Sequence, residues 1–267
     1  VKRIKPQVFT PYDVHQENYT KLLWWFEGVT SYYDDLVLYR TGIIDQDQYL
    51  TIIVENLNNV YKFAGVTQQS VANSSLTSWV KYYRQDENSP NSIVSYYVKG
   101  SLVALCLDLL LRSKSQFSLD SVMLHLFKLW QVNPIGVAED EFPALIQAAT
   151  GVDLAEFIQQ ATETTEMLPY VELLAQFGLD LTTRLAKNHQ DSGKFNLNAS
   201  SAVPLVVGDL GAKLEKQALG YLVKNVYVDT PAERAGLAAN DLIVALNQVK
   251  LTNLEKQLAF IQNGESI

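Results

Sequence analysis

The segment Leu22–Leu36, LLWWFEGVTSYYDDL, constrains the fold more than any other stretch, because it places one charge inside a long apolar and aromatic run. Glu27 is the only charged residue between Lys21 and Asp34. If the segment is a helix, the turn around Glu27 is largely apolar and should be buried. A carboxylate in such a place is costly unless a cation, a metal ion or strong donors compensate it. The alternative is a Glu at the helix edge that reaches water or an arginine.

Composition and charge set the broad class of protein. The chain has 267 residues, enough for two domains, and its 48% hydrophobic and 19% charged residues are ordinary for a globular protein. The net charge of −8 argues against nucleic acid and anionic membranes as partners. The single cysteine, Cys106, excludes an intramolecular disulfide, and its apolar surroundings favour a buried thiol. No apolar stretch reaches about 18 residues without a charge, so we expect no membrane span.

Helical spacing predicts that about the first 180 residues are all-helical. Asp45 with Gln48 has the spacing of a capping box, and so does Asp153 with Glu156. Gly42 is expected to end the first helix. Helices are expected over 19–40, after Asp45, and over 70–84, 92–111, 118–130, 140–150, 154–162 and 169–176.

The sequence pattern changes near Leu179. Residues 188–201 are polar and are predicted to form a linker. After them, residues 204–207, 221–228 and 242–246 are β-rich runs separated by Gly, Asp, Pro and Asn. The sequence therefore predicts a helical domain over 1–187 and a β-containing domain over 202–267.

The segment from Trp24 to Tyr33, W-x-x-E-G-x-T-S-Y-Y, resembles the third-ligand helix of gluzincin metallopeptidases. In that group two histidines of an H-E-x-x-H helix and a later Glu hold one zinc ion. The closest resemblance is to the glycyl aminopeptidase family, zinc peptidases with a C-terminal PDZ domain. Further matching stretches are VKRIKP at 1–6, ENYTKLLWWFEG at 17–28, KYYRQDENSPN at 81–91, SYYVKGSLVALCLDL at 95–109 and TPAERAGLAANDLIVALN at 230–247.

The resemblance covers nearly the whole chain and implies a multidomain α plus β fold. An all-helical gluzincin C-terminal subdomain over 1–187 would be followed by a partial PDZ domain over 202–267. In the family, the VKRIKP stretch lies just after the H-E-x-x-H helix. The chain is therefore expected to be an internal fragment of a longer protein, inactive alone and lacking the last PDZ strand or strands.

Zinc is the cofactor that the resemblance implies, with Glu27 as the third ligand. The family needs two histidines four residues apart and a Glu base beside the first. His15, His125 and His189 do not have this spacing, and none has a Glu next to it. The remaining ligands and the base are therefore expected upstream of Val1. A site outside the family pattern that uses His15 with Glu27 is the alternative.

Tyr97 is the candidate catalytic residue. Tyr97-Val98-Lys99-Gly100 resembles the Y-x-K-G of aminopeptidase N-type gluzincins, in which the Tyr hydroxyl donates to the oxyanion of the tetrahedral intermediate. The alternative is one of fourteen tyrosines packing at a helix start. Tyr96 and Tyr97, if both are helical, point about 100° apart, so only one should face the site.

Three further acidic residues lie near these motifs. Glu87, in a predicted loop over 85–91, is a candidate for binding the α-amine of a peptide substrate, although capping of the following helix is the favoured role. Asp34 and Asp35 lie about two turns beyond Glu27 and are expected to support the site or to lie at the surface.

The C-terminal segment resembles bacterial PDZ domains. Residues 230–247 resemble S-P-A-x-x-A-G-L-x-x-G-D-x-I-x-x-x-N. Pro231 suits the start of a short helix and Gly236 its end. Asn240 stands where the pattern has Gly, and Asn tolerates a positive φ.

PDZ domains bind the C-terminus of a peptide by adding it as a strand beside a carboxylate loop. Leu210, Gly211 and Ala212 are one candidate for that loop, and residues 219–221 are the other. The position of the first candidate relative to Thr230 favours it.

Two functions are compatible with these patterns. The resemblance implies a zinc-dependent aminopeptidase that removes N-terminal Gly or Ala from peptides, with Glu27 completing the metal site and Tyr97 stabilising the oxyanion. The alternative is a non-catalytic helical scaffold with a peptide-binding PDZ module. The single cysteine and the lack of a signal-peptide pattern favour the cytoplasm, with the periplasm as the alternative.

Overall fold

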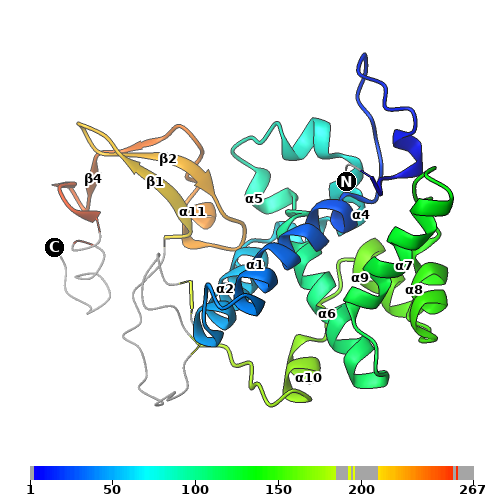
Figure 1. The fold of residues 1–267 in the computed structure, drawn as a ribbon. Helices are drawn as coiled ribbons and strands as arrows, with labels where there is room; N and C mark the ends of the chain where they lie inside the picture. Colours follow the sequence, from blue (N-terminus) through cyan, green and yellow to red (C-terminus); the bar gives the residue numbers. More distant parts are fainter. Residues whose placement is uncertain (1–2, 185–191, 194, 196–209, 255–256, 258–267) are drawn as a thin grey trace.

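The computed structural model describes residues 3–184, 192–193, 195, 210–254 and 257 (Figure 1). Helices make up the regular structure of residues 3–184, and small antiparallel sheets lie in residues 210–254. The expected fold class, a helical region followed by a PDZ-like α plus β region, is confirmed. The predicted linker falls mostly outside the described residues, and so does the predicted strand at 204–207. None of the described helices combines the length and apolar character needed to cross a membrane.

The helical region is built from short and medium helices, several of which begin or end where the sequence predicts. Asp45 caps its helix with Gln48 in the predicted capping box, and Gly151 ends another with a φ of 73°. The helices are η1 (Gln7–Phe9), η2 (Trp24–Val29), α1 (Thr30–Arg40), α2 (Gln46–Tyr61), α3 (Gly65–Gln68), α4 (Val71–Leu76), η3 (Ser78–Tyr82), α5 (Ser89–Ser92), α6 (Val98–Lys114), α7 (Leu119–Val132), α8 (Phe142–Thr150), α9 (Ala155–Glu163) and α10 (Tyr170–Ala175).

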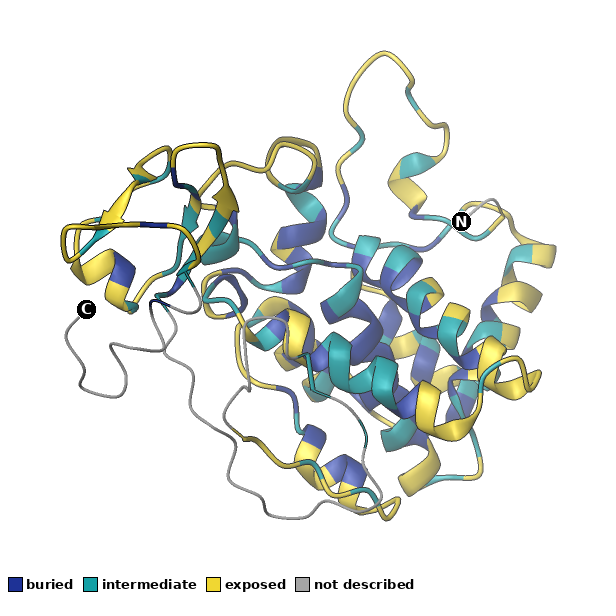
Figure 2. Ribbon diagram, turned by 90° about the vertical axis from the view of Figure 1, so that its left-hand side faces the viewer, coloured by how far each residue is buried: buried dark blue, intermediate teal, exposed yellow. Residues whose placement is uncertain are grey.

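Helix α6 is the centre of the helical region. Every residue from Lys99 to Asp108 is buried, and η2, α1, α2, α7 and α10 pack around this helix (Figure 2). The Leu-rich run that predicted a buried helix is therefore the core of the fold. Cys106 lies within it, fully buried as expected, and burial raises the pKa of its thiol well above its usual range.

Four boundary predictions are wrong in informative ways. The helix expected over 19–40 is a π-helix, η2, continued by α1, and the helix expected over 70–84 is broken at Thr77 into α4 and η3. Helix α6 starts at Val98, since Ile93 is extended. The second capping box is absent because Asp153 accepts a bond from the amide of Ala155 instead.

The β-containing region holds β1 (Ala212–Lys216), β2 (Tyr221–Val226), α11 (Pro231–Arg234), β3 (Leu242–Ile243), β4 (Ala245–Leu246) and β5 (Val249–Lys250). The first sheet is antiparallel in the order β1-β2-β3, so β1 lies at its edge. Thr230 caps α11, and Asn240 has the positive φ, 75°, that the sequence led us to expect. Strand β1 was not predicted.

Candidate functional site

Glu27 lies inside the π-helix η2, which begins with three buried aromatic residues, Trp24, Trp25 and Phe26. The amide of Trp24 at the start of η2 donates to Ser75 Oγ at 2.9 Å. The hydroxyl groups of two residues just after η2 donate to a backbone carbonyl of this π-helical turn. Thr30 Oγ1 donates to the Glu27 carbonyl at 2.7 Å, and Ser31 Oγ donates to the same oxygen at 2.9 Å.

Two glycines bring η2 and α6 into backbone contact. A Cβ added at Gly28 would lie 2.6 Å from the Cα of Gly100, and a Cβ at Gly100 would lie 2.6 Å from the carbonyl oxygen of Trp24. Only residues without side chains permit this crossing. It brings Glu27, next to Gly28, close to the start of α6, where Tyr97 is the residue that precedes the helix.

The Glu27 carboxylate is half-buried and forms no hydrogen bond or ion pair with another described residue. Burial raises the pKa of its carboxyl group. A partly desolvated carboxylate without a partner is an unfavourable arrangement that a bound cation would relieve. The sequence made Glu27 a candidate ligand because its carboxylate is surrounded by apolar residues, and the structure shows this environment.

Tyr96 and Tyr97 differ in burial and not in direction. Their rings are stacked with centroids 4.5 Å apart, and both hydroxyls lie within 3.3 Å of Tyr83 Oη. The expectation that they point about 100° apart is therefore wrong. Tyr96 is fully buried whereas Tyr97 is half-buried, so Tyr97 is the accessible one. Burial, the hydrogen bond with Tyr83 and the negative charge of Glu27 together raise the pKa of Tyr97 to about 12.

The two tyrosines of the T-S-Y-Y motif anchor α1 to its neighbours. Tyr32 donates to the buried Asp108 Oδ2 at 2.9 Å, and Tyr33 donates to Asp120 Oδ1 at 2.7 Å. Asp108 also accepts a bond from the amide of Leu119 at 2.7 Å, so a single carboxylate joins α1, α6 and the start of α7. These contacts fix the helix that carries the Glu27 motif.

Lys99, in the same Y-x-K-G motif, is fully buried in α6, and its Nζ has no hydrogen-bond partner among the described residues. Burial lowers its pKa to about 8. Burial of this cation is not predictable from the sequence, because a Lys in the first turn of a helix usually reaches water.

Among the described residues, the side chain of Glu87 forms no hydrogen bond with Glu27 or Tyr97. Glu87 is exposed, and its backbone carbonyl accepts a bond from Asn225 Nδ2 in β2 at 2.9 Å. Asp34 is exposed and Asp35 half-buried, and neither contributes a described bond to Glu27. A role of Glu87 in binding the substrate amine stays a prediction.

The preferred PDZ loop lies at the start of the edge strand β1. Gly211 has a φ of 78°, and the Leu210 carbonyl accepts a bond from the amide of Ala232 at 2.8 Å. Among the described strands, β1, which begins at Ala212, pairs on one side only, with β2, and an edge strand is a template for strand addition. The alternative loop, residues 219–221, lies at the turn between β1 and β2 and includes Tyr221, the first residue of β2.

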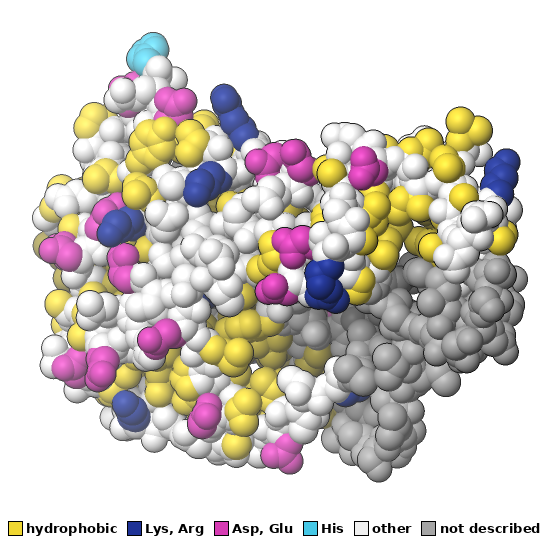
Figure 3. Space-filling model, turned by 180° about the vertical axis from the view of Figure 1, so that it is seen from behind, with side chains coloured by type: hydrophobic (Ala, Val, Ile, Leu, Met, Phe, Trp, Pro, Cys, Tyr) yellow, Lys and Arg dark blue, Asp and Glu magenta, His cyan; other side chains and the backbone are white. Residues whose placement is uncertain are grey.

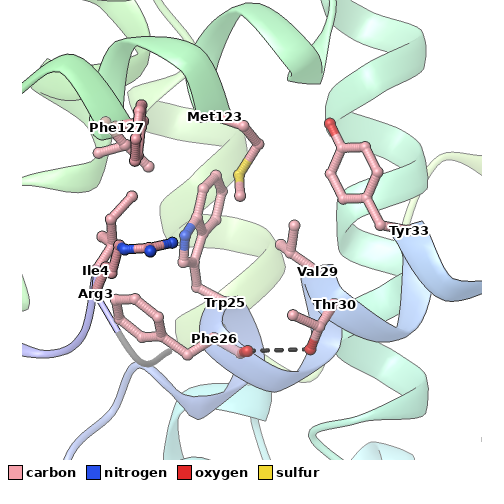
Figure 4. A pocket seen from close by; sticks show the side chains of 10 residues that line it. Arg3, Ile4, Trp25, Phe26, Val29, Thr30, Tyr33, Met123 and Phe127 are labelled. Carbon is pink, nitrogen blue, oxygen red and sulfur yellow. Dashed lines mark hydrogen bonds between the residues drawn. The ribbon is translucent and has the colours of Figure 1, made fainter.

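Two cavities lie away from the Glu27 and Tyr97 side chains. The first, about 300 Å³, is apolar and lies between η2 and α7, with the side chains of Trp25, Phe26 and Met123 around it and Arg3 reaching in from the N-terminal segment (Figure 4). The second, about 240 Å³, lies where Phe63 and Asn91 face Gly211 and the start of α11. Their linings do not include Glu27 or Tyr97, so neither is the candidate reaction site.

The part of the chain that the structure describes contains no group of three or more His, Cys, Asp or Glu side chains arranged to hold a metal ion. Acidic side chains are spread over the surface singly or in small groups, as one face shows (Figure 3). His15 is exposed on the N-terminal segment and His125 is half-buried on α7. His189 lies outside the described residues.

Residues 1–103 match the family model of the M61 glycyl aminopeptidases, and residues 222–267 match that of a PDZ domain. The resemblance to the glycyl aminopeptidase family is confirmed. The segment matched to this family contains Glu27, Glu87 and Tyr97, whereas residues 210–212 precede the PDZ match.

A solved structure supports the same assignment. An aminopeptidase N family protein from Idiomarina loihiensis is 39% identical, with a TM-score of 0.85 over 96% of this chain and 43% of that one. The chain therefore spans less than half the length of this structural neighbour. No match is found among curated proteins.

The glycyl aminopeptidase motifs contain three structural features that sequence reasoning missed. Gly28 of E-G and Gly100 of Y-x-K-G form the contact between η2 and α6. The sequence signal for this close contact is a Gly inside each of two helices that are otherwise rich in large apolar residues, since an interior Gly often marks close helix packing. The third feature, the contact of Tyr83 with Tyr97, had no sequence signal because these residues are fourteen positions apart.

Proposed function

We propose that the chain is part of a zinc-dependent aminopeptidase in which Glu27 is a metal ligand and the Tyr97 hydroxyl stabilises the oxyanion. The observation that carries the proposal is the crossing of η2 and α6. At this crossing a half-buried carboxylate without a described partner lies within electrostatic range of a half-buried phenol. A metal ligand beside an oxyanion donor is the combination that peptide hydrolysis requires.

Glu27 fits zinc as one ligand. Carboxylate oxygens bind zinc, and the raised pKa of Glu27 is the mark of a site that favours neutralisation of its charge. Among the described residues, Glu27 is not part of a group of three or more His, Cys, Asp or Glu side chains that could hold a metal ion. The remaining ligands and the general base are therefore proposed to come from another part of a longer protein, in line with the greater length of the structural neighbour.

Tyr97 is suited to donate a proton in a hydrogen bond at neutral pH. Because its pKa is raised to about 12, the phenol stays protonated throughout the physiological range and can donate to an oxygen that gains negative charge. Zinc, when bound, would polarise the scissile carbonyl and activate a water molecule. Tyr97 would act on the same carbonyl oxygen, and its own proton would remain on Oη.

The substrate class and the PDZ function are also part of the proposal. The family resemblance supports peptides with N-terminal Gly or Ala as substrates, bound by their free amine, with Glu87 as a candidate partner. The position of β1 at the edge of the described sheet, beside residues 210–212, supports binding of a peptide C-terminus. We propose the cytoplasm as the compartment.

The test uses the full-length protein that contains this sequence. Zinc content and hydrolysis of Gly- and Ala-anilides are measured for wild type, Glu27→Ala and Tyr97→Phe. We expect Glu27→Ala to lose zinc, and Tyr97→Phe to keep zinc while kcat falls about 100-fold. Asp34→Asn is the control for Glu27, since Asp34 is an exposed carboxylate on the continuing helix α1 and should leave both zinc content and activity unchanged.

A wild type that binds no zinc and cleaves neither anilide contradicts the proposal. The non-catalytic scaffold with a peptide-binding PDZ module would then be the better description. Retention of zinc by Glu27→Ala, with wild-type activity, would remove Glu27 from the site even if the protein is a peptidase.

A further inference from the structure

Four tyrosines from two segments meet beside the start of α6. Tyr82 and Tyr83 lie at the end of η3, and Tyr96 and Tyr97 precede α6. The ring centroids of Tyr82 and Tyr96 are 4.8 Å apart, and those of Tyr82 and Tyr83 are 5.6 Å apart. The cluster therefore joins the proposed oxyanion donor to a helix that lies earlier in the chain.

The hydroxyl groups of three of these residues are linked through Tyr83. Tyr83 Oη lies 2.9 Å from Tyr96 Oη and 3.3 Å from Tyr97 Oη. The Tyr82 hydroxyl does not join them, because it bonds to Ser95 Oγ at 3.1 Å. Tyr83 is thus the hydroxyl that connects a fully buried phenol to the accessible one.

Either hydroxyl of each pair could be the donor. Tyr96 is 0% exposed, and a buried O–H that is left without an acceptor is costly, so a bond donated by Tyr96 to Tyr83 satisfies the buried group. If Tyr83 in turn donates to Tyr97 Oη, the oxygen of Tyr97 is occupied as an acceptor, and the Tyr97 hydrogen points away from the cluster. This arrangement is the one on which the inference below is built.

We propose that Tyr83 is a positioning residue for Tyr97: the bonds from Tyr96 to Tyr83 and from Tyr83 to Tyr97 fix the rotation of the Tyr97 hydroxyl, so that its hydrogen faces the substrate carbonyl. This inference rests on the proposed function of Tyr97. Successive hydrogen bonds of this kind also polarise one another, which makes Tyr97 a stronger donor. Tyr83 itself touches neither substrate nor metal in this scheme. Its 60% exposure leaves it open to solvent.

The test compares Tyr83→Phe with Tyr82→Phe in the full-length protein. Both changes remove one hydroxyl from adjacent residues of the same cluster. We expect Tyr83→Phe to lower kcat for an Ala-anilide about tenfold with KM and zinc content unchanged, whereas Tyr82→Phe changes kcat less than about twofold. If Tyr83 acts only through Tyr97, the double variant Tyr83→Phe/Tyr97→Phe is no slower than Tyr97→Phe alone.

A second measurement does not depend on activity. In protein labelled with ¹³Cζ-tyrosine, the resonance that disappears in Tyr97→Phe is assigned to Tyr97. We expect this resonance to shift in Tyr83→Phe and to stay in place in Tyr82→Phe. An unchanged resonance in Tyr83→Phe overturns the proposed bond.

The kinetic outcomes separate this inference from the proposed function. An inactive wild type overturns both. An active wild type whose Tyr83→Phe variant is as fast as Tyr82→Phe, or faster than wild type, overturns the positioning role alone. A faster variant would mean that Tyr83 withdraws the Tyr97 hydrogen from the substrate. Additive losses in the double variant would show that Tyr83 acts by another route.

Discussion

The helical region and the β-containing region are held together in different ways. In the helical region, α6 is buried from Lys99 to Asp108 and packs on several other helices. Among the described residues of 210–254, the buried apolar side chains are Val223, Ala232 and Leu251. The helical region thus has a core of its own, whereas the described part of the β-containing region has little apolar burial.

Contacts with the helical region compensate for part of this difference. Asn91 Nδ2 donates to the Val226 carbonyl at 2.8 Å, and Asn91 Oδ1 accepts from the amide of Val228 at 3.2 Å. One amide side chain therefore satisfies the backbone at the end of β2. The ring of Tyr227 packs on Phe63, with centroids 5.1 Å apart. The β-containing region is tethered to α5, which precedes Tyr97 in the chain, and to Phe63 between α2 and α3.

The largest expected effect breaks the core of the helical region. Gly100→Ala places a Cβ 2.6 Å from the Trp24 carbonyl oxygen, where only backbone can move, so we expect a loss of about 3 kcal/mol in the free energy of unfolding. Chemical denaturation followed by far-UV circular dichroism measures it. Ser113→Ala, on the exposed face of the same helix, is the control and should stay within about 0.5 kcal/mol. An equal effect of both variants would contradict the close crossing of η2 and α6.

A smaller effect of opposite sign is expected from Lys99→Met. The folded protein disfavours the buried cation, so its replacement should raise the free energy of unfolding by roughly 2–3 kcal/mol at pH 7. Since the Lys99 pKa falls to about 8, the unfolded wild type binds more protons between about pH 8 and 10.5, and wild-type stability gains from rising pH in that window. This gain should be absent in the variant.

Urea denaturation at several pH values measures the difference between wild type and Lys99→Met. Lys114→Met is the matched control, because Lys114 is exposed at the end of the same helix. If both variants follow the wild-type pH dependence, Lys99 is not buried as a cation that the fold disfavours.

The smallest expected effect is local and concerns the two hydrogen bonds between Asn91 and the end of β2. Asn91→Ala should leave the helical region intact and lower the protection of β2 against hydrogen exchange by about tenfold, since two bonds to its end are lost. Hydrogen exchange with mass spectrometry resolves the two regions. Lys224→Ala, an exposed change on the same strand, should have little effect. Equal loss of protection in both regions after Asn91→Ala would mean that they unfold as one unit.

Much of this organisation follows from local sequence. The capping box of Asp45 and Gln48 and the motif after Thr230 were predicted because each depends on a few adjacent residues. The candidate pair Glu27 and Tyr97 came from family motifs, and the structure places them within electrostatic range.

What could not be predicted depends on packing between distant residues. The residues of the π-helix at Trp24–Val29 could equally form an α-helix. The change from i→i+4 to i→i+5 hydrogen bonds therefore cannot be predicted from the sequence of this segment. Strand β1 alternates only weakly between half-buried and exposed positions. The bond from Tyr83 to Tyr97 requires the return of the chain after η3, which no local pattern specifies.

The π-helix has a consequence for how tightly the length of this segment is constrained. Each residue of a regular helix turns the chain by about 100°, and a wider turn adds one residue without advancing the face that follows. Removing one residue from Trp24–Val29 would therefore restore a regular helix and leave the aromatic residues before it and the Tyr32 and Tyr33 anchors after it on their faces. Removing one residue from the regular helix α1 would instead turn the faces on its two sides by about 100° relative to each other. A single-residue deletion should thus be better tolerated in the π-helix than in α1.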